Sequence, residues 1–166
     1  MSSPLPFDPV QEAHRHWVAH GWAGAADGMA VVTSIARAQQ ILLARIDDQL
    51  RDLGLTFARY ELLMLLHFSR EGALPLTKIG ARLQVHPTSI TSAVDRLERQ
   101  ELVVREPHPT DRRTKLAVLT DAGRERALEA TTRLNANVFA SPGISGPDAD
   151  ELVRILRSLR EAAGDF

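Results

Sequence analysis

The sequence has 166 residues and contains no cysteine. This absence excludes disulfide bonds, thiolate zinc sites, iron–sulfur clusters and thiol nucleophiles, and it also excludes a switch based on cysteine oxidation. No apolar run approaches the ~20 residues that a membrane-spanning helix needs. Residues 1–11 lack the basic and apolar segments of a secretion signal. We therefore expect a cytoplasmic protein without a membrane partner.

Signatures of catalysis are missing as well. The chain has no Gly-x-Ser-x-Gly elbow, no phosphate-binding loop, no dinucleotide-binding glycines and no His-Glu-x-x-His pair. His14, His16 and His20 cluster near the N-terminus with Glu12, at spacings that helical metal ligands can have. A solvated helix face is the simpler interpretation of this cluster. We expect no enzyme activity, no metal site and no required cofactor.

The net charge of −1 hides an uneven distribution of charge along the chain. Residues 78–115 contain eight basic and five acidic side chains, a net charge of +3, whereas the rest contains 12 basic and 16 acidic side chains. A positive segment of this kind is suited to contact with nucleic-acid phosphates.

Apolar periodicity predicts that most of the chain is helical. Glycines at positions 21, 24 and 28 are expected to separate a short first helix from a long second one, Gly54 to cap the end of the second, and Thr56 to begin the third. The predicted helices are Val10–Gly21, Met29–Leu53, Phe57–Ser69, Thr77–Leu83, Pro87–Gln100, Asp121–Asn137 and Asp148–Ala163. Two β-like runs, Leu102–Glu106 and Thr114–Leu119, flank a turn-rich segment and predict a hairpin.

The resulting fold class is mainly α with a small β-wing. We expect a winged helix-turn-helix lobe over 54–119 and a helical dimerisation lobe built from both chain ends, 29–53 and 120–163. Residues 1–28 form an N-terminal arm and short helix. Terminal helices with wide apolar stripes usually need a partner, so a dimer interface is preferred to the alternative that they close one core.

The segment Leu76–Leu97 has the pattern of a helix-turn-helix. Ile79, Leu83 and Val85 supply apolar positions, and Gly80 is a small residue where the second helix crosses. The outer face of the second helix is rich in hydroxyl groups, which can bond to phosphates and base edges. The candidate DNA-binding residues there are Pro87, Thr88, Ser89, Thr91, Ser92 and Arg96.

The hairpin adds a basic wing. Its turn, PHPTDRRTK, holds Arg112, Arg113 and Lys115, and arginine side chains on such a tip can enter a narrow minor groove. Asp111 is expected to pair with an arginine and hold the tip in shape.

These segments together resemble the MarR family of bacterial transcription regulators. The resemblance covers residues 29–163 and depends on GLTFARYELLMLL, on Leu76–Leu97 and on LVVREPHPTDRRTKLAVLTDAG. It implies a homodimer that binds a double-stranded, pseudo-palindromic DNA operator. The second helix of the motif would contact the major groove and the wing the minor groove, with Asp111 and Arg113 as a structural pair at the wing base. A repressor released by a small aromatic or anionic ligand is the implied activity.

The resemblance also implies a ligand pocket between the dimer helices and the DNA-binding lobe. Its candidate lining residues are Trp17, Trp22, Arg45, Phe57, Tyr60, Met64, His67 and Phe68. Two positions depart from the family pattern. Gln84 stands where many helix-turn-helix motifs have glycine, and His86 stands where a serine often caps the second helix, which leaves the cap to Thr88 or Ser89.

One alternative remains open at this point. A winged-helix fold can also serve as a protein-interaction module without specific DNA binding. The basic wing and the hydroxyl-rich helix face favour DNA, because a protein-binding module would need neither.

Overall fold

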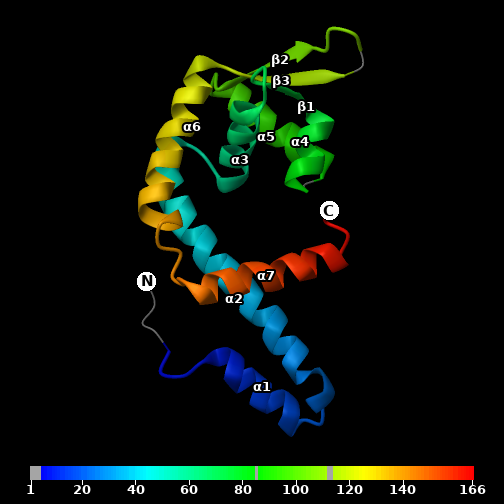
Figure 1. Ribbon diagram of the computed structural model, residues 1–166, viewed down its shortest axis with the longest axis vertical. Coiled ribbons are helices and arrows are strands. Elements are labelled where there is room, and N and C mark those ends of the chain that lie inside the picture. Colours follow the sequence, from blue (N-terminus) through cyan, green and yellow to red (C-terminus); the bar gives the residue numbers. More distant parts are fainter. Residues whose placement is uncertain (1–4, 85, 112–113) are drawn as a thin grey trace. The chain divides into compact units, whose positions relative to one another are not determined.

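The computed structural model describes residues 5–84, 86–111 and 114–166 (Figure 1). Its helices are α1 (Pro9–Ala19), α2 (Ala23–Leu50), α3 (Phe57–Phe68), α4 (Leu76–Leu83), α5 (Pro87–Arg99), α6 (Asp121–Leu134) and α7 (Pro147–Ala162). A short 3-10 helix, η1 (Arg51–Leu53), follows α2, and a π-helical segment, η2 (Asn135–Phe139), follows α6. The strands are β1 (Ala73–Pro75), β2 (Val103–Pro107) and β3 (Lys115–Leu119). The expected mainly helical fold with a small wing is confirmed.

The chain forms two compact units, Met1–Arg45 and Ile46–Phe166. In the first unit, α1 lies beside the beginning of α2, and the imidazole Nε2 of His14 is 2.8 Å from a carboxylate oxygen of Asp27. Gly21, with φ of +84°, provides the turn between these helices.

The prediction that Gly24 and Gly28 also break the helix is wrong, because α2 begins at Ala23 and includes both. A glycine inside a helix costs only about 1 kcal/mol relative to alanine. Neighbouring alanines, one of them (Ala26) buried, are sufficient to continue the helix through these positions.

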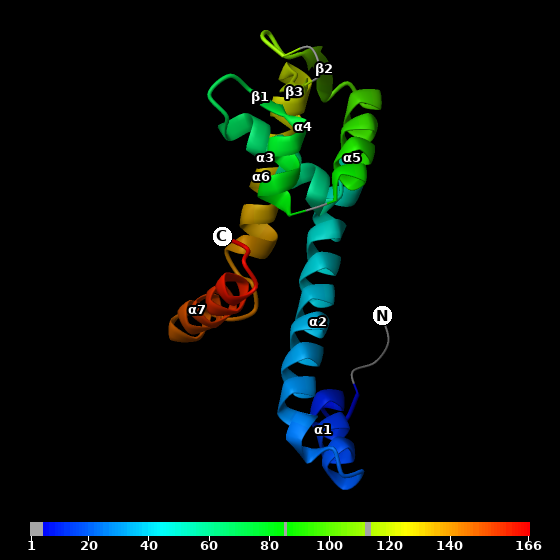
Figure 2. The same ribbon diagram turned by 90° about the vertical axis from the view of Figure 1, so that its right-hand side faces the viewer.

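The second unit has one hydrophobic core with α3 at its centre. Leu62, Leu63 and Leu66 of α3 are fully buried, as the sequence predicts for a helix that is apolar on most sides. Ile79 of α4 and Leu97 of α5 pack into the same core. Helices α3, α4 and α5 group beside the β2–β3 hairpin, and in Figure 2 α5 lies at the edge of that group.

The sheet has three antiparallel strands in the order β1-β3-β2. Strand β2 pairs with β3 from Val103 opposite Leu119 to Pro107 opposite Lys115, so the predicted hairpin is confirmed. Strand β1 pairs with the other edge of β3, with Ala73 opposite Val118. Strand β1 is not predicted by the sequence, since three residues are too few for an alternating pattern and the last is a proline, which is tolerated only on an edge strand.

The first turn of α6 fits closely against the segment that precedes β2. Thr120 caps the helix by accepting a hydrogen bond from the Gly123 backbone N–H at 2.9 Å, and its hydroxyl donates to the Glu101 carbonyl at 2.8 Å. A Cβ atom at Gly123 would lie 2.0 Å from the Leu102 carbonyl oxygen. Only glycine therefore permits this approach of helix and backbone.

The expected helix ends differ in two further places. The long second helix ends at Leu50 and continues as η1 rather than as α-helix to Leu53, and α6 changes to π-helix after Leu134. The left-handed C-cap at Gly54, with φ of 67°, is confirmed. Thr56 is the N-cap residue of α3, but its side chain makes no capping hydrogen bond.

Candidate nucleic-acid interface

The N-cap of helix α5 is a histidine, which differs from the prediction. The imidazole Nδ1 of His86 accepts a hydrogen bond from the backbone N–H of Thr88 at 3.3 Å. Pro87 is the first helical residue and has no N–H, so the next free donor is that of Thr88. The cap is therefore His86 itself and not Thr88 or Ser89, and it requires the His86 tautomer that leaves Nδ1 unprotonated.

The two sides of α5 differ as the pattern predicts. Ile90, Val94 and Leu97 are buried against the core. The opposite side is exposed, and its members are Thr88, Ser89, Thr91, Ser92, Asp95, Arg96 and Arg99. This arrangement presents short hydroxyl side chains near the helix N-terminus, where a phosphate or base edge can approach closely. Their contact with DNA stays a prediction.

The acidic side chains of α5 are engaged by the hairpin. Arg105 of β2 forms ion pairs with Asp95, at 2.5 Å, and with Glu98. Its guanidinium also donates to the Thr91 carbonyl at 3.3 Å. Partial burial by itself lowers the pKa of Arg105, but hydrogen bonds and the negative charges of Asp95 and Glu98 outweigh this, and the pKa is raised above its ordinary value. The negative charges of both carboxylates are therefore balanced by Arg105 in the protein without DNA.

A basic groove lies between the start of α3 and the exposed face of α5. Its volume is about 650 Å³, and its lining residues are Thr56, Ala58, Arg59, Thr88, Ser89, Ser92, Ala93 and Arg96. Partial burial, together with the positive charge of Arg96, lowers the pKa of Arg59 below its ordinary value. Arg59 is not among the residues predicted from the sequence, because a single arginine in the first turn of a helix gives no signal until the fold places it beside α5.

Two hydrogen bonds join Asp111 and Thr114 in the hairpin. The Thr114 hydroxyl donates to a carboxylate oxygen of Asp111 at 2.7 Å, and the Thr114 backbone N–H donates to the Asp111 carbonyl at 3.1 Å. Lys115 is exposed at the start of β3. Arg112 and Arg113 lie outside the described residues, and with them the predicted pairing of Asp111 with an arginine.

A separate cavity of about 460 Å³ collects some of the predicted ligand-binding residues. It is lined by Phe57, Tyr60, Glu61, Met64, Leu65, Phe68, Leu83, Thr131, Asn135 and Phe139. The rings of Phe57 and Tyr60 are stacked with centroids 6.1 Å apart, and the Tyr60 hydroxyl is 3.1 Å from that of Thr131. Glu61 could have been predicted, since it follows Phe57 by one helical turn. The residues from α6 and η2 could not, because only the tertiary fold brings them there.

The remaining predicted ligand-binding residues are engaged elsewhere. His67 does not line this cavity, and its Nδ1 is 3.0 Å from a guanidinium nitrogen of Arg124. Trp17 and Trp22 belong to the first unit, where their rings meet edge to face at 5.4 Å. Arg45 is the last residue of that unit.

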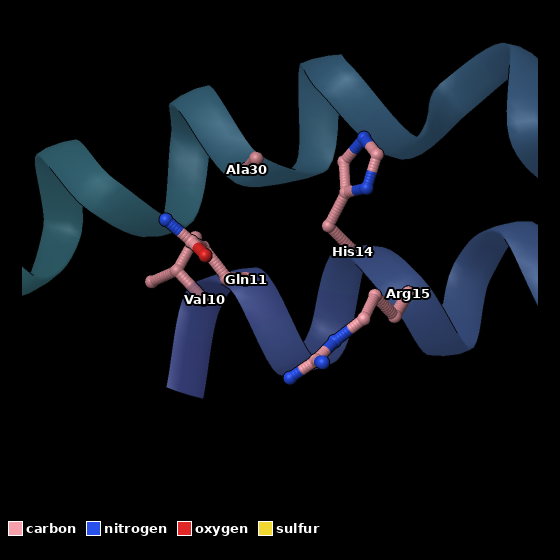
Figure 3. Close-up of a pocket in the computed structure, with 5 residues that line it drawn as sticks. All are labelled: Val10, Gln11, His14, Arg15 and Ala30. Atoms are coloured by element: carbon pink, nitrogen blue, oxygen red, sulfur yellow. The ribbon is translucent and has the colours of Figure 1, made fainter. Parts of the chain in front are cut away.

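The N-terminal histidines do not converge. A cleft of about 310 Å³ between α1 and α2 is lined by Val10, Gln11, His14, Arg15 and Ala30. These side chains are drawn in Figure 3. His14 is directed to α2, whereas the Nε2 of His16 is 3.2 Å from Glu12 on the same helix. Within residues 5–84, 86–111 and 114–166, no group of three or more histidine or acidic side chains is arranged to hold a metal ion. In that same part of the chain, no helix is both long and apolar enough to cross a membrane.

Comparison with known proteins agrees with this geometry. The sequence profile described as "MarR family" matches residues 55–115. The crystal structure of Sco5413, a MarR family transcriptional regulator from Streptomyces coelicolor, is 51% identical, with a TM-score of 0.77, and the match covers 84% of this chain and 97% of that one. The chain belongs to the MarR family of transcriptional regulators.

Two other similar proteins are informative. Sco3205 from Streptomyces coelicolor, solved in complex with DNA, is 30% identical with a TM-score of 0.72, over 82% of this chain and 88% of that one. The HTH-type transcriptional regulator MhqR of Bacillus subtilis (strain 168) is 34% identical over 89 residues, which is 54% of this chain. The match spans only 60% of the length of MhqR.

Proposed function

We propose that this member of the MarR family is a sequence-specific DNA-binding transcriptional regulator and not an enzyme. Helix α5 enters the major groove with the hydroxyl face that begins at Thr88, and Arg96 reaches a base or phosphate from the next turns. The β2–β3 hairpin follows the minor groove with Arg112, Arg113 and Lys115. The observation that supports this most is the exposed hydroxyl face of α5, together with the pairing of the Asp95 and Glu98 carboxylates with Arg105.

The proposed assembly is a homodimer that binds a pseudo-palindromic operator. No residue of α7 is buried in the single chain, although Leu152, Val153, Ile155 and Leu159 are all large and apolar. An amphipathic helix of 16 residues is marginal without a packing partner, so a second chain is the natural cover for it. Segments 29–53 and 120–163 would form the dimer lobe and 54–119 the DNA-binding lobe, with 1–28 as an arm. Half-sites would lie roughly 10–10.5 bp apart.

The proposed activity is repression relieved by a small molecule, and the place of action is the cytoplasm. The cavity between α3, α6 and η2 is apolar and aromatic, which suits a small aromatic ligand. Among relatives that are each 26% identical, CouR from Rhodococcus jostii RHA1 is bound to p-coumaroyl-CoA, and DNA binding by BpsR from Bordetella bronchiseptica is regulated by 6-hydroxynicotinic acid. By analogy, we assign the cavity to an aromatic acid or its conjugate.

The proposal is tested by selection of DNA. The purified protein is mixed with fragments of its own genome, the retained fragments are sequenced, and the recovered site and an unrelated duplex are titrated by fluorescence anisotropy. We expect a two-fold symmetric site that binds on the order of 10³-fold tighter than the unrelated duplex. Absence of binding to either duplex at low salt would contradict the proposal and favour a protein-interaction module.

A further inference from the structure

The basic groove between α3 and α5 has the composition of an anion site. Two arginines and four hydroxyl side chains line it, and none of its lining residues is acidic. The two acidic side chains nearest in sequence to Arg96, Asp95 and Glu98, are both paired with Arg105. Within residues 5–84, 86–111 and 114–166, neither Arg59 nor Arg96 has a carboxylate partner. The positive charge of the groove is therefore not neutralised by a carboxylate of the described residues.

Arg59 is held in position by its own end of α3. Its Nε donates to the Thr56 hydroxyl at 3.2 Å, and one terminal nitrogen, Nη1, donates to the Gly54 carbonyl at 2.9 Å. The other terminal nitrogen has no hydrogen-bond partner in the described part of the chain. A guanidinium fixed through two of its nitrogens loses little conformational entropy when the third binds an anion.

The proximity of Arg59 and Arg96 is unfavourable without an anion. The repulsion contributes to the lowered pKa of Arg59, after the effect of burial. An anion bound by both side chains would turn this repulsion into attraction. The hydroxyl groups of Ser89 and Ser92 line the same groove and can donate to the same anion.

We propose that this groove binds a phosphodiester of the DNA backbone, with Arg59 of α3 and Arg96 of α5 as its charged ligands. The proposal rests on the proposed function, because it presupposes that the protein binds DNA. It adds Arg59, a residue outside the helix-turn-helix, to the contacts with DNA. Arg59 positions α5 on the duplex by a phosphate contact and contributes equally at every sequence. In this arrangement the DNA backbone lies across the N-terminal ends of both α3 and α5.

The test compares variants by the salt dependence of their binding to a mixed-sequence duplex of about 30 bp, roughly three helical turns. For Arg59→Gln we expect about tenfold weaker binding near 50 mM salt and a slope of log K against log salt that is smaller by about 1 per bound chain. Arg59→Lys should keep most of the slope. Arg133→Gln is the matched control, because it removes the same charge from α6, where Arg133 pairs with Glu129.

A second variant distinguishes loss of DNA binding from loss of folding. Ala58→Asp places a carboxylate in the groove, at the second residue of α3, where a negative charge favours the helix. It should weaken binding at least as much as Arg59→Gln with an undiminished melting temperature. Arg59→Gln should also fold, because the Gly54 carbonyl keeps its hydrogen bond from Gln100 at 3.1 Å.

The outcomes separate the two proposals. If the wild-type protein binds the duplex but Ala58→Asp and Arg59→Gln bind with unchanged affinity and slope, the phosphate site is wrong and the proposed function stands. If the variants lose affinity for the selected operator but not for the mixed-sequence duplex, Arg59 contacts a base and the phosphate assignment is overturned. If the wild-type protein binds no duplex at low salt, both proposals are overturned.

Discussion

Arg105 on strand β2 and Asp95 on helix α5 form an ion pair with a nitrogen–oxygen distance of 2.5 Å. Glu98, three residues further along α5, binds the same guanidinium. One side chain of the hairpin, Arg105, is thus ion-paired with both acidic residues of the proposed DNA-contacting helix. Because Arg105 balances the negative charges of both carboxylates, the same side chain influences the geometry and the charge of the proposed interface.

Arg105→Gln is predicted to affect both stability and DNA binding. The arginine side chain is only 22% exposed while its partners are 49% and 39% exposed, so we expect a loss of about 1 kcal/mol in the free energy of unfolding. DNA affinity should fall further, because the freed carboxylate of Asp95 lies close to the incoming phosphates. Urea denaturation and anisotropy titration measure the two effects. Arg51→Gln, which breaks an exposed pair with Asp48, is the control and should change neither by much.

Gly123→Ala is predicted to destabilise the fold strongly. The added methyl group would meet the Leu102 carbonyl oxygen at 2.0 Å and a methyl carbon of Leu119 at 2.9 Å, so α6 must move away from the sheet. Overpacking of this kind costs typically 1–3 kcal/mol. The control is Gly24→Ala in α2, where an added Cβ would have no atom within 4 Å. This substitution should stabilise the helix by up to about 1 kcal/mol. Equal melting temperatures for the two variants would contradict this account of Gly123.

Sequence periodicity predicts those parts of the fold that local residues determine. The buried face of α3, the hydroxyl face of α5 and the hairpin all follow from spacing and turn chemistry. Gln84 illustrates the limit: it stands where many such motifs have glycine, and its φ of 51° shows that the left-handed turn is kept. A glutamine at that position gives no local signal of such a turn. Its side chain also donates to the Asp165 carbonyl at 3.1 Å, a contact between residues 81 positions apart.

Several of the unpredicted features depend on contacts between distant segments. Strand β1 is defined by its pairing with β3, and Arg59 becomes part of the candidate interface only when α3 packs beside α5. The cap of α5 was mispredicted for a chemical reason, since neutral histidine can accept a hydrogen bond as serine does. The pairing of Arg105 with two acids of α5 is likewise invisible to a count of charges along the chain, which treats all three side chains as exposed.

Ile155→Glu is predicted to convert the dimer into a monomer. Ile155 and Leu159 are 49% and 53% exposed in the single chain and lie on one stripe of α7 with Leu152. A carboxylate buried against a second apolar helix would be unpaired, which is strongly unfavourable. Size-exclusion chromatography with light scattering should show half the wild-type mass, together with loss of operator binding. Ser158→Glu, off this stripe, should remain dimeric, and a monomeric wild-type protein would exclude the proposed assembly.

Thr91→Ala and Arg113→Ala are predicted to weaken DNA binding in different ways. Thr91 is exposed on α5 and is expected to contact a base edge, so its loss should relax the preference at one position by about 1–3 kcal/mol. The Arg113→Ala substitution, on the wing, should lower the affinity for DNA of every sequence and reduce the salt dependence of binding. Selection of binding sites from a random library distinguishes the two. A uniform loss for Thr91→Ala would assign that residue to the phosphate backbone.

Glu61→Gln is predicted to stabilise the protein at neutral pH. Glu61 lines the cavity beside Phe57 and Tyr60, and burial raises the pKa of its carboxyl above the ordinary value of 4.5. Between 4.5 and the raised value the native state holds more protons than the unfolded state, so the free energy of unfolding falls as pH rises through this window. The gain from Glu61→Gln should therefore be present at pH 7 and disappear below the ordinary pKa.

The same substitution should strengthen the binding of an aromatic acid. At neutral pH the ionised Glu61 repels a ligand carboxylate in the cavity, and the neutral amide does not. Urea denaturation between about pH 4 and 8 measures the effect on stability, and calorimetric titration with 6-hydroxynicotinic acid as a probe measures the effect on binding. Glu71→Gln is the matched control, because that side chain is exposed after α3 and is not part of the cavity. A stability difference between wild type and Glu61→Gln that does not vary with pH would contradict the assignment, since a purely steric effect of the amide has no such dependence.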